Sequence, residues 1–127
     1  AVQEILRLTV DAMEKDSELI ARRIEPLEEV IDDMVLLLKN RHTARLRQGK
    51  CTVDSGLIFL EILTYIERTA DQCSSLAMLL VGKNHQEIMK NHHRYLQELH
   101  ESGDRSYLDE LESRKLQYLM PLEEIQF

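Results

Sequence analysis

The chain has 127 residues, of which 43% are apolar, and this is enough for one domain with its own core. With only 4 Gly, 2 Pro and 2 Phe and no Trp, the composition favours helix over strand and predicts an all-α fold. The formal net charge of -7 argues against a nucleic-acid partner, and no apolar run reaches the roughly 20 residues that a membrane span needs.

A first helix is predicted from the amino terminus to about Lys15. Apolar residues and one threonine recur there at spacings of three and four, which places one buried stripe on a helix. The stripe consists of Val2, Ile5, Leu6, Thr9, Ala12 and Met13. Asp16 or Ser17 can cap the following helix, because a short side-chain oxygen accepts hydrogen bonds from the unpaired amides of a first turn.

The second predicted helix is long and carries the heptad pattern of helix bundles. Its seam residues step by four and three along the chain: Ile20, Ile24, Leu27, Ile31, Met34 and Leu38. Pro26 interrupts this pattern, and proline removes a helical hydrogen bond, so we expect a kink or break between Arg22 and Pro26. The pattern then resumes in phase, and Gly49 is expected to end the helix.

A third helix follows the turn at residues 49–52 and shows the clearest pattern in the sequence. Its seam consists of Phe59, Leu63, Ile66, Ala70, Cys73, Ala77 and Leu80. A glycine and two polar residues at 82–84 close this helix. Since short connections make neighbouring helices antiparallel, residues 1–84 are predicted to form an up-down-up three-helix bundle.

Residues 85–127 are predicted to form a C-terminal helical extension that packs on the bundle or on a partner. A fourth helical segment is expected within residues 88–99, and residues 102–104 break it. A last amphipathic stretch carries apolar residues from Tyr107 to Leu119, before Pro121. The packing partner of this stretch does not follow from its pattern.

The histidines and cysteines form no zinc or redox motif. Most of the histidines lie in the C-terminal extension, at His85, His92, His93 and His100. Within this group, histidines that are seven residues apart would lie two helical turns from each other. Zinc ligands on one helix are a single turn apart, so we interpret these histidines as surface residues. Cys51 and Cys73 are too far apart for a CxxC site, and separate thiols suit the reducing cytoplasm.

Two pairs of carboxylates flank the seams of the second and third helices. Glu28 precedes Asp32 by four residues, and Glu67 precedes Asp71 by the same step, so each pair lies on one helix face. Like flanks meet when two helices run antiparallel, which would bring the four carboxylates together. Hard oxygen ligands suit iron, manganese, magnesium or calcium, so a metal site is one interpretation. Local pairing with basic side chains such as Lys39 is the other.

A further acidic pair, Glu29 and Asp33, lies farther from the seam and is expected on the solvent face. The sequence carries no glycine-rich phosphate loop, no nucleophile elbow and no HExxH motif. The Glu-x-x-His motif of ferritin-like sites is also missing, which counts against a carboxylate-bridged metal oxidase. We therefore predict that the protein is not an enzyme and that it uses no organic cofactor.

The segment from Arg41 to Leu80, RHTARLRQGKCTVDSGLIFLEILTYIERTADQCSSLAMLL, resembles the PhoU-like domain of bacterial sodium/phosphate cotransporter II-related proteins. The shared features are a helix end with histidine and arginine, a glycine turn, a short cap and an I-E-R-x-A-D core. The C-terminal extension also resembles that of transporter-linked members. The family's E-x-x-x-D signature, associated with iron or other metal ions, falls on Glu67 and Asp71, and its companion pair falls on Glu28 and Asp32.

The resemblance implies a soluble regulatory domain on the cytoplasmic side of the plasma membrane. Its partner would be a membrane transporter half in the same polypeptide, whose phosphate transport it modulates by metal-dependent or protein–protein binding. Iron or another divalent metal ion would be bound at Glu28, Asp32, Glu67 and Asp71. A homodimer would cover helix flanks that one bundle leaves exposed. Two alternatives remain open: a carboxylate-bridged metal-binding enzyme or storage fragment, and a ligand-free helical scaffold.

Overall fold

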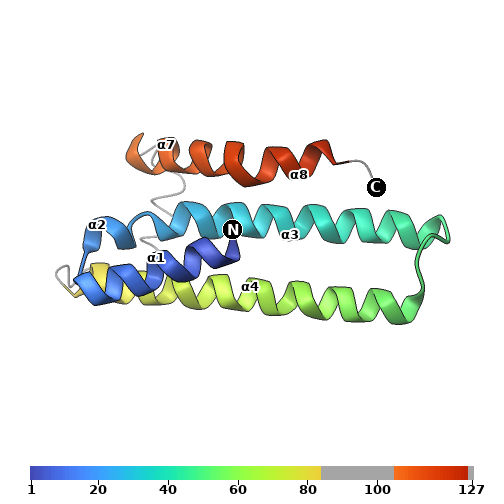
Figure 1. Ribbon diagram of the computed structural model, residues 1–127, viewed down its shortest axis with the longest axis horizontal. Helices are drawn as coiled ribbons and strands as arrows, with labels where there is room; N and C mark the ends of the chain where they lie inside the picture. The colour runs from blue at the N-terminus through green and yellow to red at the C-terminus, as the bar shows by residue number, and fades with distance from the viewer. Residues whose placement is uncertain (84–104, 126–127) are drawn as a thin grey trace.

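The computed structural model describes residues 1–83 and 105–125, and all regular structure within these residues is helical (Figure 1). The elements are α1 (Val2–Lys15), α2 (Glu18–Ala21), α3 (Ile24–Arg47), α4 (Val53–Gly82), α7 (Arg105–Arg114), the π-helical turn η1 (Lys115–Leu119) and α8 (Met120–Glu124). The predicted all-α class is confirmed for this part of the chain. The predicted segment at 88–99, its break at 102–104 and the four tail histidines lie outside the described residues.

The two long helices, α3 and α4, run antiparallel along the molecule (Figure 1). α1 lies beside the C-terminal half of α4 and runs in the same direction as α4. The continuous stretch of α7, η1 and α8 lies on the other side of α3. α3 is therefore the central helix of the described part, because it contacts α4 on one side and the C-terminal helices on the other.

The break between α2 and α3 is the one that the sequence predicts. Ser17 caps α2, because its Oγ accepts a hydrogen bond from the N–H of Ile20 at 3.2 Å. The helix is interrupted at residues 22–23, and α3 then begins at Ile24. Pro26 consequently falls in the first turn of α3, where its missing N–H removes no intrahelical hydrogen bond. The expected break before Pro26 is confirmed.

The turn between α3 and α4 depends on a glycine in the left-handed region. Gly49 has a φ of 67°, and the following N–H, of Lys50, donates to the carbonyl of Arg45 at 2.9 Å, as in a Schellman motif. Thr52 then caps α4, because its Oγ1 accepts from the N–H of Ser55 at 3.2 Å. Gly49 ends the helix as predicted.

The main core lies between α1, α2, α3 and α4. Most of its buried side chains belong to the predicted seams: Ile5, Ala12, Ile24, Leu27, Ile31, Leu63, Ala70, Cys73, Ala77 and Leu80. On α3, however, Val35 is buried in this core, whereas Met34 of the predicted seam is only partly buried. The reason is that α3 packs against α4 with one face and against α7 with another. Met34 packs with Val30 in a second, smaller core against Tyr107 and Leu111 of α7.

Polar contacts also join the C-terminal helices to the rest of the molecule. Arg114 is buried and forms ion pairs with Glu4 of α1 and Glu110 of α7. Tyr118 donates a hydrogen bond to Glu4. Tyr107 donates one to Glu29, so Glu29 is half-buried under α7 and does not lie on a solvent face. The expectation for Glu29 was wrong, because the position of α7 does not follow from the pattern of α3.

Candidate metal centre

The acidic flanks of α3 and α4 face each other in the structure. Glu28 and Asp32 on α3 lie next to Asp71 on α4, and one carboxylate oxygen from each residue lies within 4.8 Å of the others. Glu28 and Asp32 are one helical turn apart, so they project from the same face of α3. Glu28 is buried, at 8% exposure, whereas Asp32 and Asp71 are exposed. The cluster therefore has a buried end and an end that is open to solvent.

Glu67, the fourth predicted ligand, lies outside this cluster. Its Oε1 accepts a hydrogen bond from Lys39 Nζ at 2.9 Å, and this ion pair links α3 to α4 one turn away from Asp71. Both side chains are partly exposed, so the pair adds little to stability. The structure thus brings together three of the four predicted residues. It places Glu67 beside Lys39, the basic residue that was the alternative partner in the sequence-based interpretation.

Glu25 and Ser74 extend the contact between the two flanks toward the other end of the cluster. Ser74 Oγ donates to Glu25 Oε2 at 2.5 Å, and both residues are buried. The charge of Glu25 also acts on Glu28. Sequence reasoning did not include Glu25 or Ser74 in the site. The available signal was their spacing, since each lies three residues from a predicted ligand on its own helix, Glu28 and Asp71 respectively.

Two carboxyl groups of the cluster, those of Glu28 and Asp32, have raised pKa values. Burial, then the charge of Glu25 and the hydrogen bonds with Asp32 and Asp71, raises the pKa of Glu28 to about 10. Burial also raises the pKa of Asp32, although its hydrogen bond with Glu28 acts in the opposite direction. Glu28 therefore carries a proton at neutral pH, and a protonated carboxyl group can donate to neighbouring carboxylates.

The donor set of the cluster fits a hard divalent cation. Oxygen ligands at about 2.0 to 2.6 Å from an ion lie at most about 4 to 5 Å from one another. The three carboxylates of Glu28, Asp32 and Asp71 already meet this condition, with oxygens within 4.8 Å. Within residues 1–83 and 105–125, this is the one group of three or more His, Cys, Asp or Glu residues that does so.

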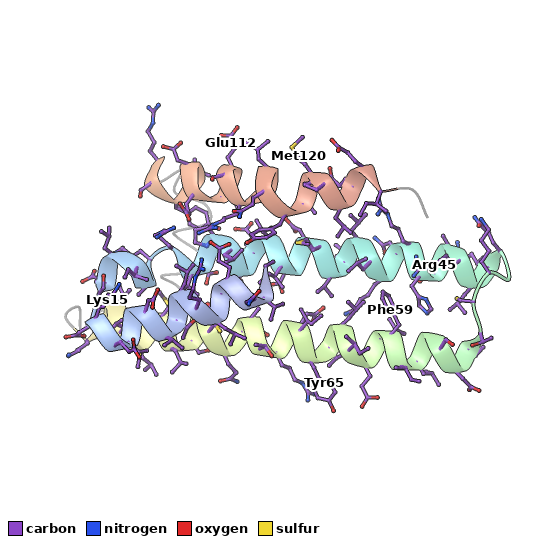
Figure 2. The ribbon with its side chains drawn as sticks, viewed as in Figure 1. Lys15, Arg45, Phe59, Tyr65, Glu112 and Met120 are labelled. Carbon is purple, nitrogen blue, oxygen red and sulfur yellow. The ribbon has the colours of Figure 1, made fainter. Side chains whose placement is uncertain are left out.

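A second polar cluster lies at the turn end of α3 and α4, and its contacts are structural. His42 is buried, its ring lies 5.3 Å from the ring of Phe59, and its Nδ1 is 3.8 Å from Cys51 Sγ. Side chains at this end, including the labelled Arg45 and Phe59, fill the space between the two helices (Figure 2). Cys51 is a free thiol. The contact with His42 is a long one for a sulfur hydrogen bond, so we assign no chemistry to it.

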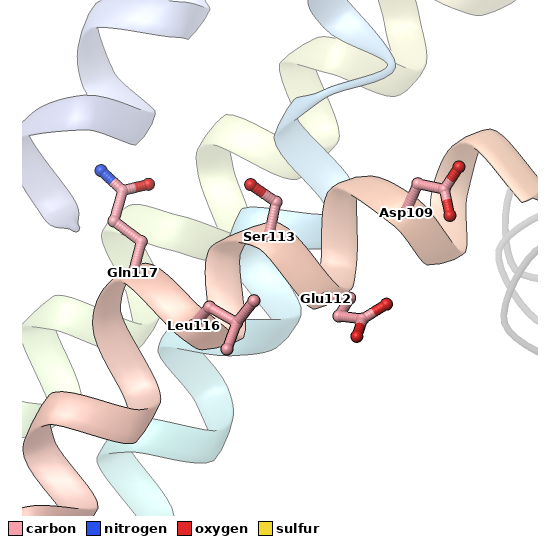
Figure 3. Close-up of a pocket in the computed structure, with 5 residues that line it drawn as sticks. All are labelled: Asp109, Glu112, Ser113, Leu116 and Gln117. Atoms are coloured by element: carbon pink, nitrogen blue, oxygen red, sulfur yellow. The ribbon is translucent and has the colours of Figure 1, made fainter.

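A hollow on the C-terminal helices carries no comparable constellation. The residues that line it are Asp109, Glu112, Ser113, Leu116 and Gln117 (Figure 3). All of these described lining residues come from α7 and η1, along one side of a single helical stretch. A surface formed by one helix does not enclose a small molecule, so the acidic cluster between α3 and α4 remains the candidate site.

Fold and site together define an all-helical protein with a carboxylate cluster between its two long antiparallel helices. Comparison with known families is more specific, because the profile described as the PhoU domain matches residues 1–80. The chain therefore belongs to the PhoU family, which is regulatory and non-enzymatic and acts in phosphate homeostasis. No curated protein and no solved structure matches the chain. Among the described helices, none has the length and apolar character needed to cross a membrane.

Proposed function

We propose that this chain is the regulatory, PhoU-type three-helix domain of a sodium/phosphate cotransporter-related membrane protein. In this proposal it lies on the cytoplasmic side of the plasma membrane and modulates phosphate transport by the transporter half of the same polypeptide. The PhoU match over residues 1–80 supports the regulatory role in phosphate homeostasis. The resemblance of residues 41–80 to the transporter-linked members supports the connection to a transporter.

The regulatory signal in this proposal is a divalent metal ion, such as iron, held by Glu28, Asp32 and Asp71. The observation that carries it is the convergence of three carboxylates from two helices, one of them buried. Such an ion would offset the mutual repulsion of these carboxylates. Glu28 would release its proton, and Asp32 and Asp71 would bind from the open side. Glu67 would join only after giving up its contact with Lys39.

The position of the cluster suits a switch. It lies between α3 and α4, and α3 also contacts the C-terminal helices, so a change in helix packing at the cluster would reach both sides of α3. A ligand shifts such an equilibrium only by its difference in affinity for the two packings. Here the ion would bind more tightly to the packing in which Glu28 and Asp32 of α3 lie closer to Asp71 of α4.

The experiment is sodium-dependent uptake of labelled phosphate by cells that carry the intact polypeptide. With the natural sequence, uptake should fall when phosphate is plentiful. With Glu28→Gln and Asp71→Asn together, uptake should persist but lose this response. Asp33→Asn, a change of one nearby acid on α3, is the matched control and should keep the response. Absence of sodium-dependent uptake, or an unchanged response in the double variant, would overturn the proposal.

A further inference from the structure

The turn that joins α3 to α4 combines exposed aliphatic side chains with basic ones. Four large apolar side chains on either side of this turn are between 38% and 69% exposed: Leu46, Val53, Leu57 and Ile58. Residues 34–53 contain no acidic residue but five basic ones: Lys39, Arg41, Arg45, Arg47 and Lys50. The charge at this end of the molecule is therefore opposite in sign to the net charge of -7 on the chain. We call residues 45–58 the turn end.

Two basic side chains at the turn end, those of Arg47 and Lys50, are available to a partner. Lys39 is paired with a glutamate of α4, Arg41 donates to carbonyl groups at the end of α8, and Arg45 lies 5.6 Å from the centre of an aromatic ring. Arg47 and Lys50, by contrast, are exposed and form no ion pair within residues 1–83 and 105–125. Two such cations beside exposed aliphatic groups suit a partner that is anionic at its surface and apolar underneath.

The turn end projects beyond the other helices of the described part. Figure 1 shows α3 and α4 continuing past α1 and past the end of α8 before they reach the turn. Arg41 marks where α8 ends, because its guanidinium donates to the carbonyl groups of Leu122 and Glu123 at 2.7 and 2.8 Å. Gly49 lies eight residues farther along the chain, which is about 12 Å at 1.5 Å per residue. A flat partner can therefore reach the turn end without touching α8.

We propose that the turn end docks on the surface of a membrane that contains anionic lipids. The side chains of Val53, Leu57 and Ile58 enter the boundary between headgroups and acyl chains, while Arg47 and Lys50 bind lipid phosphates. Apolar groups of peripheral proteins reach about 5 to 10 Å into this boundary, and the projection of about 12 Å covers that depth. Long basic side chains keep their charges at the headgroups while their stems lie along apolar surface.

The shape of the turn end favours a lipid surface over a protein partner. A turn between two helix ends is narrow and projects outward, whereas a standard protein interface takes about 800 Å² from each partner. A lipid surface adapts to a few inserted side chains and needs no complementary shape. The two exposed cations decide the sign of the lipid charge, because they gain from anionic headgroups and not from neutral ones.

The charge distribution also fixes how the molecule stands on the membrane. The net charge of -7 is repelled by an anionic surface, so the turn end approaches first and the long helices stand steeply on the membrane. Glu28 of the acidic cluster is 21 residues from Gly49, or about 30 Å along α3. This exceeds the screening length of about 8 to 10 Å, so docking and metal binding act separately. The inference depends neither on the metal centre nor on the link to a transporter.

The expected affinity follows from the charges at the turn end. Each basic residue near an anionic membrane strengthens binding about five-fold, so Arg47 and Lys50 together contribute about 25-fold. Asp54 lies in the first turn of α4 at the same end, where the surface repels it, so Asp54→Asn should strengthen binding. Salt should weaken the electrostatic part and leave the contribution of the aliphatic side chains.

The first test is co-sedimentation of the chain with vesicles of phosphatidylcholine that contain about 30% phosphatidylglycerol as the anionic lipid. The chain should bind these vesicles and leave pure phosphatidylcholine vesicles largely free. Arg47→Glu with Lys50→Glu should weaken binding more than about 25-fold. Lys15→Glu with Arg68→Glu is the matched control, because it changes the net charge equally at exposed positions far from the turn end and should weaken binding much less.

The aliphatic contribution has its own pair of variants. Leu57→Gln with Ile58→Gln should weaken binding and leave a remainder that salt removes. Leu19→Gln with Leu36→Gln changes two residues of similar exposure elsewhere and should bind as the natural chain does. Equal effects of a turn-end pair and its control, or no binding to the anionic vesicles, would overturn the proposal. Binding only to native membranes with intact proteins would also overturn it and assign the turn end to a protein partner.

The second test reads the orientation of the bound chain from an environment-sensitive fluorescent label in a Cys51→Ser background. Cys73 is buried and should stay unlabelled. A label on Leu57→Cys should shift to the blue on anionic vesicles and be quenched by lipids that are brominated in their acyl chains. A label on Leu19→Cys, on α2, should show neither change. Equal shifts of both labels, or no quenching at Leu57→Cys, would contradict docking through the turn end.

Discussion

Arg114 joins the C-terminal helices to α1, and its removal tests how much that junction stabilises the fold. Its Nη1 lies 2.5 Å from Glu4 Oε1 and its Nε lies 3.0 Å from Glu110 Oε1. The arginine side chain is 6% exposed and that of Glu4 is 16% exposed. Arg114→Met retains most of the aliphatic stem but removes the charge and the hydrogen bonds. Glu4 then keeps Tyr118 as a donor but loses its buried cationic partner.

The expected loss can be worked out from these contacts. Removing one partner of a buried ion pair costs about 3 to 5 kcal/mol, because the other charge stays buried without compensation. Glu4 is only partly buried and still accepts from Tyr118, so we expect the free energy of unfolding to fall by about 2 to 3 kcal/mol. Arg7 provides the matched control, since it also approaches Glu4, at 3.9 Å, but is 70% exposed. Arg7→Met should cost under about 0.5 kcal/mol.

Urea unfolding of the chain and its two variants measures these differences. Hydrogen exchange then locates them, and faster exchange in residues 105–125 of the Arg114→Met variant would identify the C-terminal helices as the part released. A loss below about 1 kcal/mol for Arg114→Met would refute the reasoning, because it would place this pair among the weak surface pairs. Equal losses for the two arginines would refute it as well.

Three further predictions concern α3, α4 and the turn that joins them. The pKa of Glu28 is raised in the native state, so the native chain keeps a proton that the unfolded chain loses near the ordinary pKa of 4.5. Stability should therefore fall as pH rises above about 4.5. Glu28→Gln should flatten this profile in urea unfolding, and an unchanged slope would contradict the pKa shift. Gly56→Ala would place a Cβ 2.6 Å from Nε2 of the buried His42 and should cost about 1 to 3 kcal/mol by thermal unfolding. Gly49→Ala meets nothing within 4 Å but has a φ of 67°, so about 1 to 2 kcal/mol of backbone strain is expected there. A Gly56→Ala variant as stable as the natural chain would show that His42 can move away.

Local chemistry made the helix boundaries predictable from the sequence. Gly49 ends α3 because only a residue free to adopt a positive φ fits the turn, and Ser17 caps α2 because its hydroxyl is short enough to reach a first-turn amide. Pro26 marks the start of α3 because a residue without an N–H fits the first turn of a helix and not its interior. The meeting of Glu28 with Asp71 was also predictable, since it follows from heptad spacing and an antiparallel connection.

Contacts that depend on rotamer choice or on distant segments were not predictable. Glu67 and Asp71 lie on the same flank of α4, but Glu67 meets Lys39 one turn along the helix, whereas Asp71 joins Glu28 and Asp32. The pairing of Arg114 with Glu4 joins residues that are 110 positions apart, and no periodic pattern relates them. Such contacts need the three-dimensional placement of α7, which the amphipathic pattern of one helix does not supply.

The central claim, that Glu28, Asp32 and Asp71 hold a divalent metal ion, is tested most directly by elemental analysis of the purified chain after incubation with iron, manganese or zinc and removal of free metal. The account predicts about one equivalent of metal per chain, its loss in the Asp71→Asn variant, and its retention in Asp33→Asn. Absence of bound metal from the natural chain, or equal retention by Asp71→Asn, would contradict the account and leave the cluster as a proton-bridged contact between α3 and α4.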